Sequence, residues 1–280
     1  GLSAAPGLLT LILIDGLEIY EPYHMKDFNE GAISIIDVET IEGVELMTGG
    51  FPAKYGNKKS GVFSINSREP SDENRYSVGL SLMNARAMGE GRFADGKGSW
   101  FLSARRGHLD IVFNLMNLND LLAPVYYDVF SKVKYELNPQ HTVALNVLHA
   151  GDRFDIDDFA TAGFRDTIKT HETVDNSYGN SYVWTTLKST LSPQVVVESM
   201  VAGGLVTKKR HGAEVFSEIP GGVYGIGNER DFNLLSFKQD WLYEHSASML
   251  LGLGYDVRRL DTDYSFDNVV EQDPNDPSDD

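Results

Sequence analysis

The sequence predicts a β-rich fold in two parts: a small α+β unit, followed by about nine antiparallel strands of the kind that form part of a transmembrane barrel. Residues 8–68 mix strand, turn and helix signals. From residue 76 onward, apolar and polar side chains alternate with a period of two, which is typical of strands with one apolar face. Short turns alternate with long polar loops there, as they do in transmembrane barrels.

The first part contains short elements. An apolar, β-branched run ends at Asp15-Gly16, which is a turn signal. A short helix is expected over residues 38–43, with Asp37 as its N-cap, because an aspartate side chain can accept hydrogen bonds from the free N–H groups of a first helical turn. The strands predicted in this part cover residues 9–14, 44–48 and 62–67.

The second part reads as a meander of strands. In residues 126–137, valine, tyrosine and leucine alternate with aspartate, lysine and glutamate, so one face is apolar and the other is polar. The nine predicted strands cover residues 76–83, 85–93, 98–108, 126–137, 141–151, 180–191, 195–206, 231–244 and 247–260. The long loops are expected at residues 109–125, 152–179, 208–228 and 262–280.

A soluble antiparallel sandwich or propeller would show the same alternation, with a buried face in place of a lipid-facing one. Aromatic residues favour the barrel, because several lie near the predicted short turns, where the aromatic girdle of a membrane barrel is found. They are Trp100, Tyr135, Trp241 and Tyr243. A closed bacterial barrel has an even number of strands, so an odd count predicts either that this sequence is a fragment of a longer protein or that it is not a barrel.

Composition excludes several classes of function. The chain has 41 acidic and 24 basic residues, a net charge of -17 and no cysteine. This charge repels a phosphate backbone, so no nucleic-acid partner is expected. The lack of cysteine excludes disulfides, thiolate zinc sites and cysteine nucleophiles. No apolar run approaches the ~20 residues of a membrane-spanning helix, and the first residues do not form a secretory signal.

The stretch "GGFPAKYGNKKSG" at residues 49–61 needs a bent backbone. It fits neither phosphate-loop pattern and leads into a strand rather than a helix, which excludes a phosphate site. It predicts a tight double turn, with Pro52 fixing one bend and Tyr55 anchoring the loop to a packed surface. The glycines expected to adopt positive φ are Gly49, Gly50 and Gly56.

Taken in order, these segments resemble the second half of the plug domain and the first barrel strands of TonB-dependent outer-membrane receptors. The resemblance covers residues 8–110 and rests on Asp15-Gly16 after a strand, a helix leading into "IEGVELMTGG", the "PAKYG" segment and a strand that begins at Gly61. It implies that residues 1–70 are the C-terminal part of a plug. Residues 76–280 would be the N-terminal part of a barrel of about 22 strands. The structural plug positions that it marks are Asp15, Gly16, Gly49, Gly50, Pro52, Tyr55, Gly56 and Gly61.

The function implied by this resemblance is active uptake of a scarce ligand across the outer membrane of a Gram-negative bacterium. The ligand would be a siderophore, a cobalamin, a saccharide or a peptide. The implied partners are TonB, acting through a segment missing from this sequence, the ligand itself and outer-membrane lipid. No cofactor and no enzymatic activity are expected. The alternative is a secreted, soluble β-rich binding module or carbohydrate-active enzyme.

Two groups of side chains are candidates for binding sites. Tyr20, Tyr23 and His24 lie in a loop that resembles a plug apex, and they either face the ligand pocket or pack within the plug. The acidic segment after residue 151 offers alternate carboxylates, which suit calcium, although the full EF-hand pattern is absent and a solvated loop is the favoured interpretation. The calcium candidates are Asp155, Asp157 and Asp158.

Arg105 and Arg106 are predicted to lie on opposite faces of one strand, where the inner arginine would pair with a plug acid such as Glu42 or Glu45. An ordinary surface arginine is an alternative. The seven histidines are scattered without zinc spacing, and no serine lies in a nucleophile-elbow sequence. No catalytic site is therefore predicted.

Overall fold

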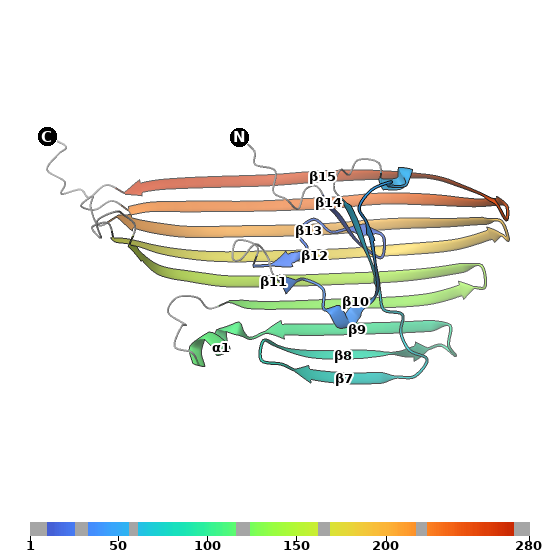
Figure 1. The fold of residues 1–280 in the computed structure, drawn as a ribbon, viewed down its shortest axis with the longest axis horizontal. Helices are drawn as coiled ribbons and strands as arrows, with labels where there is room; N and C mark the ends of the chain where they lie inside the picture. Colours follow the sequence, from blue (N-terminus) through green and yellow to red (C-terminus); the bar gives the residue numbers. More distant parts are fainter. Residues whose placement is uncertain are drawn as a thin grey trace.

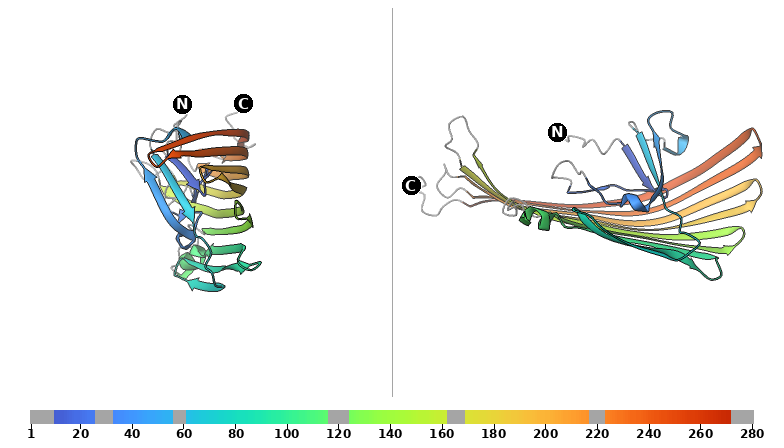
Figure 2. Two further views of the ribbon diagram at one scale, coloured as in Figure 1. Left: turned by 90° about the vertical axis from the view of Figure 1, so that its right-hand side faces the viewer. Right: turned by 60° about the horizontal axis from the view of Figure 1, so that its bottom comes forward.

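The computed structural model describes residues 10–25, 33–55, 61–115, 124–161, 169–216 and 223–271. A long, curved antiparallel sheet makes up most of the molecule, and a small N-terminal unit lies against its concave face (Figures 1 and 2). We call these parts the large sheet and the N-terminal unit.

The N-terminal unit contains a four-stranded mixed sheet with the order β2-β1-β6-β5 and a separate two-stranded ribbon, β3-β4. β1 pairs with β6 in parallel, whereas its pairing with β2 is antiparallel. The strands are β1 (Thr10–Ile14), β2 (Leu17–Glu18), β3 (Tyr23–His24), β4 (Ile33–Ser34), β5 (Ile41–Met47) and β6 (Gly61–Ser67). Two short 3₁₀ helices, η2 (Val38–Thr40) and η3 (Ala53–Tyr55), complete the described part of this unit.

The predicted turn at Asp15-Gly16 is confirmed, and its geometry explains the choice of residues. Asp15 has φ of 43° and Gly16 has φ of 84°, and the two residues join Ile14 to its antiparallel partner Leu17. Two successive residues with positive φ form the type I′ turn that best matches the twist of a hairpin, and Asp-Gly is a preferred sequence for it.

The helix expected over residues 38–43 is shorter than predicted. Asp37 caps η2 as expected, because its Oδ1 atom accepts a hydrogen bond from the N–H of Glu39 at 3.1 Å. The helix ends at Thr40, and β5 begins at Ile41. Pairing along β6 accounts for the early start of this strand, since Val44 lies opposite Ile65 and β-branched residues favour extended structure.

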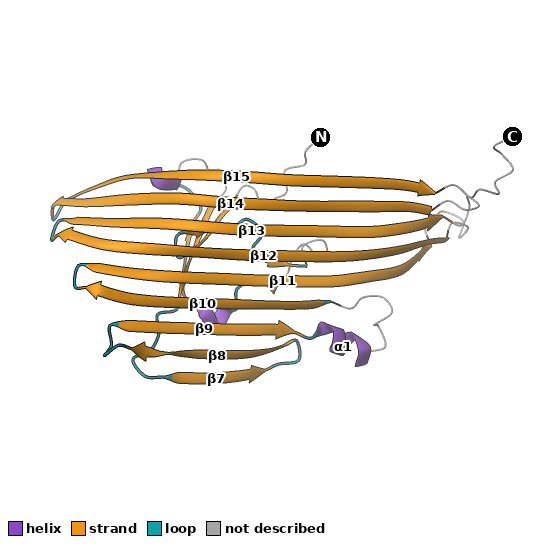
Figure 3. Ribbon diagram, turned by 180° about the vertical axis from the view of Figure 1, so that it is seen from behind, coloured by secondary structure: helices purple, strands orange, loops and turns teal. Residues whose placement is uncertain are grey.

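The large sheet confirms the predicted count of nine antiparallel strands, which follow one another in sequence order (Figure 3). The strands are β7 (Arg75–Leu80), β8 (Asn84–Phe93), β9 (Gly98–Gly107), β10 (Val125–Asn138), β11 (His141–Thr161), β12 (Lys169–Ser192), β13 (Val195–Phe216), β14 (Val223–Ser246) and β15 (Met249–Glu271). The N-terminal unit lies towards the end of the sheet where the short turns are (Figure 1).

Three of the predicted long loops are wrong over much of their length. Strands β11 to β15 run for 21 to 24 residues, through the segments expected to be loops at 152–179, 208–228 and 262–280. Charged and polar residues are frequent in these extensions and interrupt the apolar period on which the prediction depended, while the backbone pairing of the strands continues. The loop expected at 109–125 contains a short helix, α1 (Leu109–Leu115).

The two faces of the large sheet differ. Its concave face supplies buried residues that pack against the N-terminal unit. Its outer face exposes apolar side chains along the middle of the strands, which is unusual for a protein surface in contact with water. These side chains include Val133, Leu145, Val183, Val201, Leu235, Phe237 and Val257. Within the described ranges, no helix combines the length and apolar character needed to cross a membrane.

Candidate functional site

An apolar contact joins the N-terminal unit to the centre of the large sheet. One buried cluster contains side chains of β1, β2 and β6, and of the residues just after β2 and just before η2. They pack against side chains of β9 to β14. Ile14 and Trp184 are each 1% exposed, and Ile35 is completely buried. Burial of this many apolar groups makes the hydrophobic effect the main force that holds the unit in place. The cluster also contains Leu17, Ile19, Ile36, Ile65, Phe101, Phe130, Leu148, Tyr182 and Leu234.

Charged contacts tie the unit to β8 and β9. Arg86 lies 3.3 Å from the buried carboxylate of Asp37. Arg105 donates to the backbone carbonyl of Ser34 at 2.6 Å and also pairs with Asp128 of β10. The prediction that one of the two neighbouring arginines faces the N-terminal unit is confirmed, and that arginine is Arg105, but the partner acids expected, Glu42 and Glu45, are wrong. The sequence could not show that the ribbon β3-β4, rather than β5, lies against this strand.

Arg106 points the other way along the same strand, as expected from alternation. Its guanidinium lies 3.8 Å from Asp110, four residues further on. Both side chains of this pair are partly exposed, so the interaction contributes little to stability.

Two lysines of β10 form ion pairs close to the point where the chain passes from β6 to the large sheet. Lys132 is buried and lies 3.4 Å from Asp15 and 2.9 Å from Glu69, while Lys134 lies 3.0 Å from Glu69. Asp15 in turn accepts a hydrogen bond from the N–H of Ser67 at 2.8 Å. Partial burial would raise the pKa of Glu69, but the two lysines outweigh this effect and hold that pKa below its ordinary value.

Contacts with β12 and β15 involve Tyr20 and Glu18. The N–H of Tyr20 donates to the hydroxyl of Tyr182 at 3.2 Å. Arg258 of β15 pairs with Glu18 and donates to the hydroxyl of Tyr20 at 3.2 Å. Burial, together with the nearby charge of Glu18, raises the pKa of Tyr20. Tyr20 therefore joins the N-terminal unit to two strands of the large sheet as a neutral hydrogen-bonding group.

His24 is completely buried between the N-terminal unit and the large sheet. Its Nδ1 atom lies 3.1 Å from Asp152 of β11, and its Nε2 atom lies 3.4 Å from Asp128 of β10. Tyr23, the preceding residue, is exposed. The ligand-facing role of Tyr20, Tyr23 and His24 stays a prediction; Tyr23 is 42% exposed, Tyr20 is partly buried and His24 is buried.

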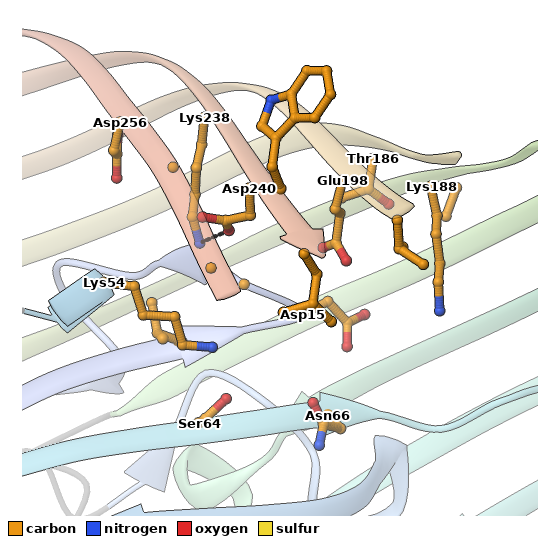
Figure 4. A pocket seen from close by; sticks show the side chains of 18 of the residues that line it. Asp15, Lys54, Ser64, Asn66, Thr186, Lys188, Glu198, Lys238, Asp240 and Asp256 are labelled. Carbon is orange, nitrogen blue, oxygen red and sulfur yellow. Dashed lines mark ion pairs between the residues drawn. The ribbon is translucent and has the colours of Figure 1, made fainter. Parts of the chain in front are cut away.

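A hollow of about 1080 Å³ separates the four-stranded sheet from β11 to β15 on the side of the short turns. Figure 4 shows charged ends pointing into this space from both walls, with Lys54 on the N-terminal unit and Lys188, Glu198 and Lys238 on the large sheet. Lys238 pairs with Asp240 at 3.1 Å. Because lysines and carboxylates both line the hollow, it suits water and polar solutes rather than an apolar ligand.

Four of the predicted plug positions line this hollow, namely Asp15, Gly16, Pro52 and Tyr55. Tyr55 packs against Leu11, Leu13 and Val62, which agrees with the anchoring role expected for it. Gly50 adopts a positive φ of 65°, whereas Gly49 does not, so that expectation is wrong. Pro52 accepts the hydrogen bond that closes η3, and Gly61 begins β6 opposite Thr10. Gly56 lies outside the described residues.

The calcium candidates Asp155, Asp157 and Asp158 fall in β11, which is a strand rather than the loop expected, and their side chains lie outside the described ones. Elsewhere in the described chain, no group of three or more histidine and carboxylate side chains could hold a metal ion.

Sequence reasoning missed Arg86, Lys132 and Arg258 as contact residues. The available signal was a basic residue on the face that otherwise carries buried side chains. On β10, Lys132 occupies the same face as Phe130 and Asp128. A charge at such a position indicates a partner inside the curved sheet, because an unpaired buried charge is costly.

Comparison with known protein families identifies the N-terminal part of the chain. Residues 2–62 match the family model described as the TonB-dependent Receptor Plug Domain. No curated protein sequence matches the chain.

Solved structures similar to this chain include three bacterial receptors, and the chain spans about half the length of each. The siderophore receptor PirA from Acinetobacter baumannii is 15% identical, with a TM-score of 0.43, over 95% of this chain and 51% of that one. A mutant of the ferric enterobactin receptor PfeA from Pseudomonas aeruginosa is 12% identical, with a TM-score of 0.40, over 92% and 51%. The outer-membrane ferripyoverdine receptor of Pseudomonas aeruginosa is 9% identical, with a TM-score of 0.43, over 93% and 46%.

Proposed function

We propose that the chain is part of a TonB-dependent receptor of the bacterial outer membrane and that it serves in TonB-dependent uptake of a scarce ligand across that membrane, since residues 2–62 match the plug-domain family model. One observation carries the proposal. A plug-family unit is docked inside the concave face of a sheet whose outer face is apolar and exposed. Such a sheet is suited to lipid on one side and to a plugged lumen on the other.

Strand lengths support the same proposal. A tilted strand needs about 9–11 residues to cross the hydrocarbon core of a bilayer. Strands β11 to β15 have about twice that length, and the apolar side chains described as exposed on their outer face lie between the middle of each strand and its short turn. The remaining half of each strand would then stand in water outside the cell, where long hairpins can enclose a ligand.

We assign residues 1–70 to the plug and residues 76–280 to the barrel wall. TonB would act through a segment outside this chain. The ligand classes that the proposal covers are siderophores, cobalamins, saccharides and peptides, since one architecture can carry different ligands. The hollow beside Lys188 and Lys238 is where displacement of the plug would open a polar passage to the periplasm.

The test is a growth assay with the full-length protein in its native host. A strain that lacks the receptor is grown with iron, cobalamin, a saccharide or a peptide as the limiting nutrient, and is compared with a TonB-deficient strain and with a complemented strain. We expect one nutrient to become limiting in both mutants and to be restored by complementation. Normal growth of the receptor mutant in all four media would contradict the proposal.

Fractionation addresses the soluble alternative directly. A transmembrane barrel should be recovered in the outer membrane and resist extraction by carbonate, and its mobility on a denaturing gel should change on heating. A soluble β-rich binding module or carbohydrate-active enzyme would show neither property. The exposed apolar outer face argues against this alternative, because a soluble sheet of this size would bury that face.

A further inference from the structure

The ribbon β3-β4 is joined to the large sheet by a buried cluster of charged groups. His24 of β3 is 0% exposed and lies between Asp128 of β10 and Asp152 of β11. Arg105 of β9 reaches the same Asp128 and the carbonyl of Ser34 in β4. Both strands of the ribbon are therefore bound to the large sheet through one cluster.

We propose that His24 is held as an imidazolium and that its second proton is what latches the ribbon β3-β4 onto β10 and β11. The geometry requires this protonation state. A neutral imidazole has one N–H donor and one acceptor nitrogen, whereas an imidazolium has two donors. Both ring nitrogens of His24 face carboxylate oxygens, at 3.1 and 3.4 Å, so a neutral ring would turn a lone pair towards an anion.

The charges around His24 balance only when the ring is protonated. The titratable and charged groups that face it are Asp128 from β10, Asp152 from β11 and Arg105 from β9, and the ring of Tyr126 packs against it with centroids 4.9 Å apart. With an imidazolium the cluster holds two cations and two carboxylates. Loss of the proton leaves a net negative charge in a site that water does not reach.

Asp152 depends on His24 for a donor, because its Oδ2 atom accepts from His24 and its Oδ1 atom is buried without a hydrogen-bond partner. A neutral ring keeps one N–H, which serves Asp152 when it stays on Nδ1, so the lone pair on Nε2 then faces Asp128. The buried site holds two carboxylates against the single charge of Arg105, and this excess negative charge favours separation of the ribbon and entry of water. Arg105 would still hold Asp128 and Ser34, which limits the change to the His24 side of the cluster.

The direction of the pH effect follows from the pKa of His24. Burial alone would lower this pKa, but the hydrogen bonds and charges of Asp128 and Asp152 outweigh burial and raise it above the ordinary value of 6.5. A group whose pKa is raised by folding contributes its stability fully below its unfolded pKa and loses it as the pH rises through the folded pKa. The latch should therefore be closed in acid and open in alkali.

The experiment is hydrogen–deuterium exchange of the full-length receptor in detergent between pH 6 and pH 10, corrected for the intrinsic pH dependence of exchange. The peptides to follow contain residues 23–25 and 33–36. We expect their protection to fall above the folded pKa by up to about tenfold per pH unit, because the latched state holds one more proton than the released state. Peptides from β13 should not change, which separates release of the ribbon from global unfolding.

Two variants and a control decide the result. His24→Gln should have a pH-independent ribbon, whereas His141→Gln, which alters a histidine bonded to Ser189 at the far end of β11, should behave like the wild type. Should His24→Gln fail to assemble, Asp152→Asn still tests the latch, because removal of one negative charge should move the opening to lower pH. Protection of the wild-type ribbon that is constant from pH 6 to pH 10, or that declines equally in the His24 variant, would overturn the proposal.

Discussion

The N-terminal unit meets β8 to β10 and β11 to β15 in different ways on the side of the short turns. Towards β8 to β10 it is held by charged groups in direct contact, such as Arg86 with Asp37 and Lys132 with Asp15. Towards β11 to β15 a hollow lies between the two parts, and the charges of Lys188 and Glu198 face open space. The difference indicates that, on the side of the short turns, ion pairs hold the unit to β8 to β10, whereas its contacts with β12 and β15 lie further from those turns, at Tyr182 and Arg258.

Removing Asp128 should have the largest effect on this attachment. Asp128→Ala removes the carboxylate that His24 and Arg105 share and leaves these buried cations without it. We therefore expect the free energy of unfolding to fall by about 3–5 kcal/mol. The measurement is a urea titration of the full-length receptor in detergent, with proteolysis of the N-terminal unit as the readout. Asp175→Ala, which breaks the exposed pair with Arg153, is the control and should cost less than about 1 kcal/mol. Equal effects of the two substitutions would show that the buried cluster does not hold the unit.

A smaller effect is expected at the turn beside the hollow. Gly16→Ala adds a Cβ atom to a residue with φ of 84°, at 3.1 Å from the Cε atom of Met200. We expect the free energy of unfolding, measured in the same titration, to fall by about 1–2 kcal/mol. Gly43→Ala is the matched control, because its new Cβ would meet nothing within 4 Å and no positive φ is involved. That variant should be neutral or slightly stabilising. A neutral Gly16 variant would mean that the turn adjusts by moving towards the hollow.

The smallest effect is expected at Glu69, which contacts β10 and lines the hollow. Glu69→Gln weakens the contacts of this side chain with Lys132 and Lys134. Because the Glu69 side chain is half exposed, the free energy of unfolding at pH 7 should fall by less than about 1 kcal/mol. Because the pKa of Glu69 is lowered, its contribution is present above its unfolded pKa of 4.5 and disappears as the pH falls through the folded pKa. Urea midpoints of variant and wild type should therefore differ at pH 7 and converge in acid. A difference that persists in acid would exclude the charge of Glu69 as its cause.

Prediction from sequence succeeded where one local signal was sufficient. Asp15-Gly16 has the residues of a type I′ turn, and Asp37 has the side chain of an N-cap, so both were found. The outer ends of β11 to β15 were missed, because charged and polar residues are frequent there and interrupt the apolar period that predicts a strand. The partner of Arg105 was missed for a different reason, since Ser34 contributes only a backbone carbonyl, which any residue at that position would provide.

The sequence by itself determined the nine-stranded meander and its apolar outer face, because alternation along a strand is a property of neighbouring residues. Only the tertiary structure decided which charges meet. His24 lies more than a hundred residues from Asp128 and from Asp152 in the sequence, and nothing in their local sequences relates the three. They come together because β10 and β11 pair in a fixed register and the N-terminal unit packs across both strands. The attachment of the unit therefore depends on contacts that form only when both parts are folded.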